Sequence, residues 1–158
     1  MFGKKERKSN ILFVDEKNDL TSQLAEYFTK ALFGDKYEVY SAGPEHDLVD
    51  CEMISVMYER GEDMRRQVSK DFRDRDHLRD DEDYDLVIYL RKNVFDEWAA
   101  RTPWKGKQIL CDLGSTEDFV ATDDFELAQC YSGLIDKVAA WVRENMANEE
   151  KLRAMISA

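Results

Sequence analysis

The chain has 158 residues and a net charge of −11 at pH 7, with 43% hydrophobic and 36% charged residues. This composition predicts one globular domain with a substantial core and disfavours a disordered chain. The excess of acidic residues disfavours binding to nucleic acid or to an anionic membrane, so we expect neither as a partner.

The length of the apolar runs and the number and spacing of the cysteines bear on the compartment in which the protein works. No apolar run reaches the roughly 18 residues of a membrane helix, and no secretory signal follows residues 1–8. The three cysteines, Cys51, Cys111 and Cys130, are far apart and odd in number, which disfavours a disulfide framework or a Cys-x-x-Cys metal site. We therefore expect a cytoplasmic protein with free thiols and no cofactor, in which Cys111 and Cys130 are buried.

Four short runs rich in β-branched and aromatic residues alternate with helical patterns along the chain. They cover residues 11–14, 37–40, 86–90 and 109–111. Such alternation is typical of an α/β fold with a parallel sheet. Three of the runs are almost continuously apolar, as expected for strands covered on both faces, whereas the second is amphipathic and indicates an edge strand.

Apolar residues at helical spacing predict the helices between these strands. A first helix begins at Thr21 or Ser22 and ends at Gly34, and a second covers residues 53–58 and ends at Gly61. A poorly defined helical stretch follows over residues 68–78, and a short helix covers residues 94–100. The sequence thus places a helix after each of the first three strands.

The last helix has the clearest pattern, an apolar stripe over residues 127–142. Asp123, followed by Glu126 three positions later, predicts a capping pair at its start. Residues after Asn145 indicate a frayed or solvent-exposed end. We therefore divide the chain into a flexible amino end (1–8), an α/β domain (9–145) and a C-terminal helical extension (146–158).

The turn between the first strand and the first helix is the candidate ligand site, because open parallel sheets bind ligands at the carboxyl ends of their strands. It contains Asp15, Glu16, Lys17, Asn18, Asp19, Leu20, Thr21 and Ser22.

The pattern of this turn resembles the low-molecular-weight protein tyrosine phosphatases and the related thioredoxin-coupled arsenate reductases. Asn18, Ser22, Ala25 and Glu26 match it, as does the tripeptide at residues 41–43. The resemblance covers about residues 9–145 and implies a four-stranded parallel sheet, ordered 2-1-3-4, with helices on both faces. It also implies a nucleophilic Cys, five further residues and an Arg, and here Asp15 and Thr21 stand at those two positions.

Both substitutions remove chemistry on which the family depends. A phosphatase of this class needs a thiolate stabilised by backbone N–H groups and a guanidinium that binds the phosphoryl group. Asp15 and Thr21 supply neither, and Glu16 and Asp19 repel an anion. The resemblance implies a general acid before the last helix, where Asp123 or Asp124 lies; for Asp123 we favour a helix-cap role. We therefore predict a catalytically inactive relative that acts as a binding or regulatory module.

Other interpretations stay open. The pocket could carry rebuilt chemistry, with Asp15 attacking a phosphate ester, or Asp15, Glu16 and Asp19 could hold a hard cation such as magnesium or calcium. Residues 71–85 contain eight acidic and three basic residues. We interpret them as a solvated helix and loop, with a surface for an unknown protein partner as the alternative.

Overall fold

The computed structural model describes residues 7–157, so most of the expected flexible amino end lies outside the described residues. Four parallel strands form one sheet: β1 (Ser9–Val14), β2 (Tyr37–Ala42), β3 (Asp83–Tyr89) and β4 (Lys105–Leu110). Their order is β2-β1-β3-β4. The predicted sheet, its order and the edge position of the second strand are confirmed.

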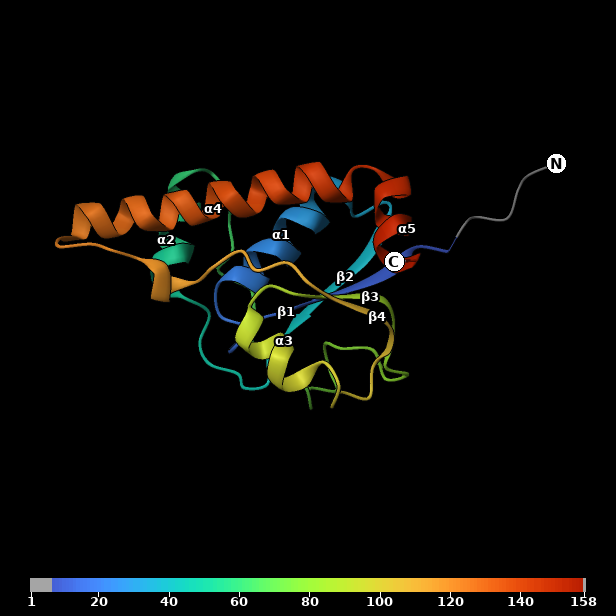
Figure 1. The fold of residues 1–158 in the computed structure, drawn as a ribbon. Helices are drawn as coiled ribbons and strands as arrows, with labels where there is room; N and C mark the ends of the chain where they lie inside the picture. Colours follow the sequence, from blue (N-terminus) through green and yellow to red (C-terminus); the bar gives the residue numbers. More distant parts are fainter. Residues whose placement is uncertain (1–6, 158) are drawn as a thin grey trace.

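Helices lie on both faces of the sheet (Figure 1). One side carries α1 (Thr21–Phe33), α2 (Cys51–Glu59), α4 (Asp124–Met146) and α5 (Glu149–Ser157), and the other carries α3 (Lys92–Trp98). Successive strand residues point to opposite faces. Ile11 and Phe13 therefore pack in the core under α1 and α4, whereas Leu12 and Val14 pack in the core beside α3.

The expected start of the last helix is confirmed in part. Asp123 is the N-cap of α4, and its carboxylate accepts a hydrogen bond from the backbone N–H of Glu126 at 2.8 Å. The Glu126 carboxylate does not return to Asp123; it accepts from the backbone N–H and the hydroxyl of Thr122. The capping is therefore one-sided.

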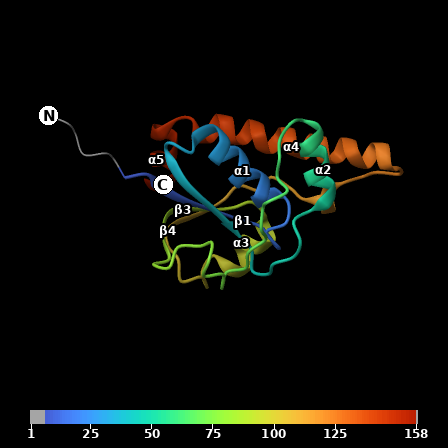
Figure 2. The ribbon, with the colours of Figure 1, turned by 180° about the vertical axis from the view of Figure 1, so that it is seen from behind.

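The helix predicted over residues 68–78 is wrong. The segment between α2 and β3 contains no helix. It begins on the α1 side, where Met64 joins the core, and then crosses so that Phe72 and Leu78 pack on the α3 side of the sheet (Figure 2). The Asp71 carboxylate accepts from the backbone N–H of Arg73, and that of Asp74 accepts from those of Asp76 and His77. These side chains take up backbone donors that a helix would use, because Asp competes for nearby N–H groups.

The carboxyl end of the chain is more integrated than its sequence indicates. Helix α5 places Leu152 in the core with 3% exposure, together with the fully buried Met146. The expectation of a solvent-exposed end is therefore wrong at Leu152. Within residues 7–157, no helix combines the length and apolar character needed to cross a membrane.

The three cysteines are free thiols, as expected. Cys51 is exposed, and Cys111 and Cys130 are each partly buried, so the prediction that these two are buried is met only in part.

Candidate functional site

The loop from Asp15 to Ser22 joins the carboxyl end of β1 to α1 and bends around Asn18. Asn18 has a φ of 51°, in the left-handed region that Asn tolerates better than most residues. Its side-chain oxygen accepts from the backbone N–H of Lys70 and from the amide of Gln23, both at 2.9 Å. Its side-chain amide donates to the hydroxyl of Ser22 at 2.7 Å. One buried Asn side chain therefore fixes the loop against two other segments.

Asp15 points into its own loop. Its two carboxylate oxygens accept from the backbone N–H groups of Asn18, at 2.6 Å, and of Ser22, at 2.8 Å. The residue is 4% exposed. Burial raises the pKa of the Asp15 carboxyl, and the hydrogen bonds from Ser22 and Asn18 offset part of that rise. Donors at a helix amino end, which can bind an anion, are here bound to a side chain of the loop itself.

Gly43 packs directly beneath the loop. A Cβ atom at this position would lie 2.8 Å from the backbone oxygen of Asp15 and 2.9 Å from the backbone nitrogen of Asn18. Only glycine allows the end of β2 to approach this closely.

The side chain of Thr21 is also bound within the protein. Its hydroxyl donates to the backbone oxygen of Gly114 at 2.8 Å, and the residue is 1% exposed. This contact ties the start of α1 to the segment after β4. It supplies no positive charge to the loop.

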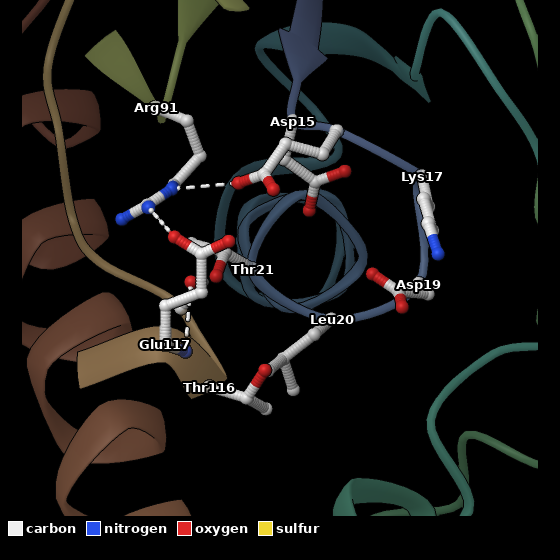
Figure 3. Close-up of a pocket in the computed structure, with 10 residues that line it drawn as sticks. Asp15, Lys17, Asp19, Leu20, Thr21, Arg91, Thr116 and Glu117 are labelled. Atoms are coloured by element: carbon white, nitrogen blue, oxygen red, sulfur yellow. Dashed lines mark hydrogen bonds and ion pairs between the residues drawn. The ribbon is translucent and has the colours of Figure 1, made fainter. Parts of the chain in front are cut away.

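A cavity of about 220 Å³ opens beside the loop (Figure 3). It is lined by Asp15, Glu16, Lys17, Asp19, Leu20, Thr21, Arg91, Ser115, Thr116 and Glu117. Six of the eight predicted site residues are thus brought together, while Asn18 and Ser22 support the loop. Neither Asp123 nor Asp124 lines the cavity.

Arg91 lines the cavity too, and the sequence did not predict it as a site residue. It follows β3, and its side chain, 11% exposed, reaches the cavity (Figure 3). Its guanidinium contacts four carboxylates, at 2.8 to 3.5 Å: those of Glu16, Asp112, Glu117 and Asp118. The signal was its position at the carboxyl end of a strand next to β1. The charge of Arg91 is thus fully engaged by acidic neighbours.

Metal binding has no geometric support here. Within the described part of the chain, no group of three or more His, Cys, Asp or Glu side chains is arranged to hold a metal ion. Both oxygens of Asp15 face N–H donors, so the hypothesis of a cation at Asp15, Glu16 and Asp19 gains nothing from the structure.

Asp19 lies in the same acidic surroundings. Burial raises its pKa to about 6, and the charge of Asp15 adds to the effect. Because this value exceeds the 3.8 of an unperturbed carboxyl, the folded chain holds the proton more tightly than the unfolded chain. The contribution of Asp19 to the free energy of unfolding therefore falls as the pH rises from about 4 to about 6.

We expect Asp19→Asn to raise the free energy of unfolding by about 1 kcal/mol at pH 7, a value reduced for solvent screening of this partly exposed side chain. The gain should disappear below pH 4, where the wild-type carboxyl is protonated. Urea unfolding at both pH values measures it, with the exposed Asp35→Asn as the matched control. An equal gain at pH 4 would contradict the assignment.

Comparison with known proteins identifies the family of this chain. The family model described as low molecular weight phosphotyrosine protein phosphatase matches residues 10–154. The chain belongs to this family. It is 30% identical over 132 residues to the glutaredoxin arsenate reductase of Synechocystis sp., covering 82% of this chain and 98% of that protein. It is 35% identical over 96 residues to the arsenate reductase of Bacillus licheniformis, covering 61% and 66%.

Solved structures of the family share the fold. An arsenate reductase in its phosphate-binding state superposes with a TM-score of 0.62 at 27% identity, covering 88% of this chain and 97% of the other. A tyrosine phosphatase of Erwinia amylovora gives a TM-score of 0.61 at 19% identity, covering 90% and 97%, and shows the fold alone.

Proposed function

We propose that this chain is a catalytically inactive member of the family and acts as a binding or regulatory module. The observation that carries the proposal is the position of the Asp15 carboxylate. It accepts from the two backbone N–H groups, of Asn18 and Ser22, that could otherwise bind an anion. A bound phosphate would have to displace this carboxylate or lie against it, and like charges repel strongly at such distances.

The rest of the cavity supports the same conclusion. Thr21 offers no guanidinium, and its hydroxyl is bound to Gly114. Arg91 brings a positive charge to the cavity, but four carboxylates engage it. Neither the nucleophile nor the clamp of a phosphatase is therefore available.

The alternative is an enzyme that uses Asp15 as a nucleophile. A nucleophilic carboxylate needs an accessible oxygen, whereas both oxygens of Asp15 are hydrogen-bonded and the residue is 4% exposed. We rank this alternative second.

We further propose a protein partner in the cytoplasm. The net charge of −11 opposes binding to nucleic acid and to anionic membranes, and free thiols at all three cysteines fit a reducing compartment.

The test is an assay of the purified chain with p-nitrophenyl phosphate and phosphotyrosine peptides, in which we expect no turnover above background. Millimolar phosphate, sulfate or arsenate should leave the melting temperature unchanged. A ligand present at 100 times its Kd would instead raise the free energy of unfolding by about 2.7 kcal/mol, and the melting temperature with it. Turnover that is lost in Asp15→Ala but kept in the exposed control Asp35→Ala would establish the rebuilt enzyme instead.

A further inference from the structure

A second cavity, of about 500 Å³, lies away from the Asp15 loop. It is lined by Phe72, Arg73, Asp74, Arg75, Leu78, Arg79, Asp80, Glu82, Tyr84 and Trp104. Tyr84 is the second residue of β3, and Trp104 immediately precedes β4. The cavity therefore lies at the amino ends of these strands, whereas the Asp15 loop follows the carboxyl end of β1. Its volume falls within the range of about 300–1,000 Å³ that is typical of small-molecule sites.

Aromatic rings form one wall of this cavity. Phe72 packs edge-to-face on Trp104, with ring centroids 4.5 Å apart, and Tyr84 does so at 6.1 Å. Tyr84 is fully buried and Trp104 is 7% exposed. Phe72 is only partly buried, so among these three rings it is the one that offers most surface for another aromatic ring to pack in edge or offset geometry.

Trp104 also brings an unused hydrogen-bond donor to the cavity. Among residues 7–157, its indole N–H has no acceptor. This N–H is not among the polar atoms that are fully buried without a partner, so solvent can reach it. The indole N–H of a Trp side chain as buried as this one normally finds an acceptor. The open position beside Trp104 therefore suits a ligand that carries an acceptor atom.

The charged groups around the cavity differ in how far they are engaged. Arg79 is held by Asp81 and Asn10. By contrast, the guanidinium groups of Arg73 and Arg75 form no hydrogen bond or ion pair with the described residues. Despite partial burial, the pKa of Asp71 is lowered, mainly by its hydrogen bond with His46, and the nearby charge of Arg73 adds little. Two guanidinium groups are thus available to bind an anionic group.

Acidic groups limit how much negative charge can enter. The Asp74 carboxylate is occupied by the backbone and ring of His77. Asp80 and Glu82 also line the cavity and form no ion pair with the described residues. They would repel a ligand with several negative charges, whereas one negative charge can be met by Arg73 and Arg75.

We propose that this cavity binds a planar aromatic small molecule that carries a single negative charge, such as an aryl carboxylate or sulfonate. The ring packs against Phe72 beside Trp104, and the acidic group accepts from the Trp104 N–H and from the guanidinium groups of Arg73 and Arg75. This site is independent of the Asp15 loop and of the function proposed for it.

The probe is 8-anilinonaphthalene-1-sulfonate, followed by its fluorescence and by calorimetry. We expect one saturable site per chain. The neutral analogue N-phenyl-1-naphthylamine should bind at least tenfold more weakly, and ATP, with several negative charges, should not displace the probe.

Substitutions locate the site. Arg73→Gln with Arg75→Gln, and separately Trp104→Phe, should each weaken binding at least tenfold, whereas Arg143→Gln on the exposed face of α4 should leave it unchanged. Near-UV circular dichroism checks that each variant folds. If Trp104→Phe does not fold, the variant of the two exposed arginines still tests the site. Equal affinity for the neutral analogue, or unchanged affinity in the arginine variant, would overturn the proposal.

Discussion

Asp15→Cys combined with Thr21→Arg is expected to give the chain anion binding and measurable hydrolysis of p-nitrophenyl phosphate, at least tenfold above either single variant. The backbone N–H groups of Asn18 and Ser22, which now bind the Asp15 carboxylate, would face a thiolate and lower its pKa. Thr21 lines the cavity, so an arginine at this position begins where the phosphoryl group must bind. In Asp15→Cys alone, the thiolate has no arginine to hold the phosphate ester. In Thr21→Arg alone, the arginine can bind the ester but no thiolate can attack it.

Two carboxylates of the cavity limit the gain. Glu16 and Asp19 line it together with the two substituted positions, so we expect the full effect only when Glu16→Gln and Asp19→Asn are added. Glu16→Gln also weakens the hold on Arg91, whose Nε donates to that carboxylate at 2.8 Å. Asp112, Glu117 and Asp118 still engage Arg91 in this variant, so its charge adds only partly to anion binding.

The matched control is the same four-fold variant with serine in place of cysteine at position 15. It should bind vanadate, detected as a rise in melting temperature, but should not turn over substrate. If the cysteine variant folds with native stability yet neither binds vanadate nor hydrolyses substrate, the loop lacks the phosphatase geometry. Asp15 and Thr21 would then not occupy the lost catalytic positions.

The strands and the place of the site could be predicted because both depend on local signals. Buried parallel strands are short apolar runs, such as residues 86–90, and their carboxyl ends mark the ligand site. The strand order came from the resemblance, since periodicity alone does not give it. The contacts of Arg91 with Glu16 and Glu117 join residues 75 and 26 positions apart, and no spacing rule connects them.

The errors also have physical causes. Residues 68–78 carry apolar side chains at roughly helical spacing, but Asp71 and Asp74 hold backbone N–H groups in turns. The carboxyl end has several charged residues around few large apolar ones, yet Leu152 lies in the core and Met155 packs against it. Two apolar side chains in so short a segment leave almost no periodic signal.

Lys70 and Glu26 form a buried ion pair behind the loop. The Lys70 ammonium lies 3.2 Å from the Glu26 carboxylate, with side-chain exposures of 6% and 5%. It also donates to the hydroxyl of Ser41 at 3.1 Å, and Gln67 donates to the other Glu26 oxygen. The pair therefore joins α1, β2 and the turn segment that supports Asn18.

We expect Lys70→Met to lower the free energy of unfolding by about 3–5 kcal/mol, because it leaves the Glu26 carboxylate buried without its main counter-charge. Adding Glu26→Gln should recover most of the loss, since a neutral amide needs no counter-charge. Urea unfolding measures both, with Lys30→Met as the control: Lys30 is 54% exposed and lies 3.8 Å from the same carboxylate, so its loss should cost less than about 1 kcal/mol. If Lys70→Met and Lys30→Met cost the same, the charge of Glu26 is met by solvent and not by Lys70.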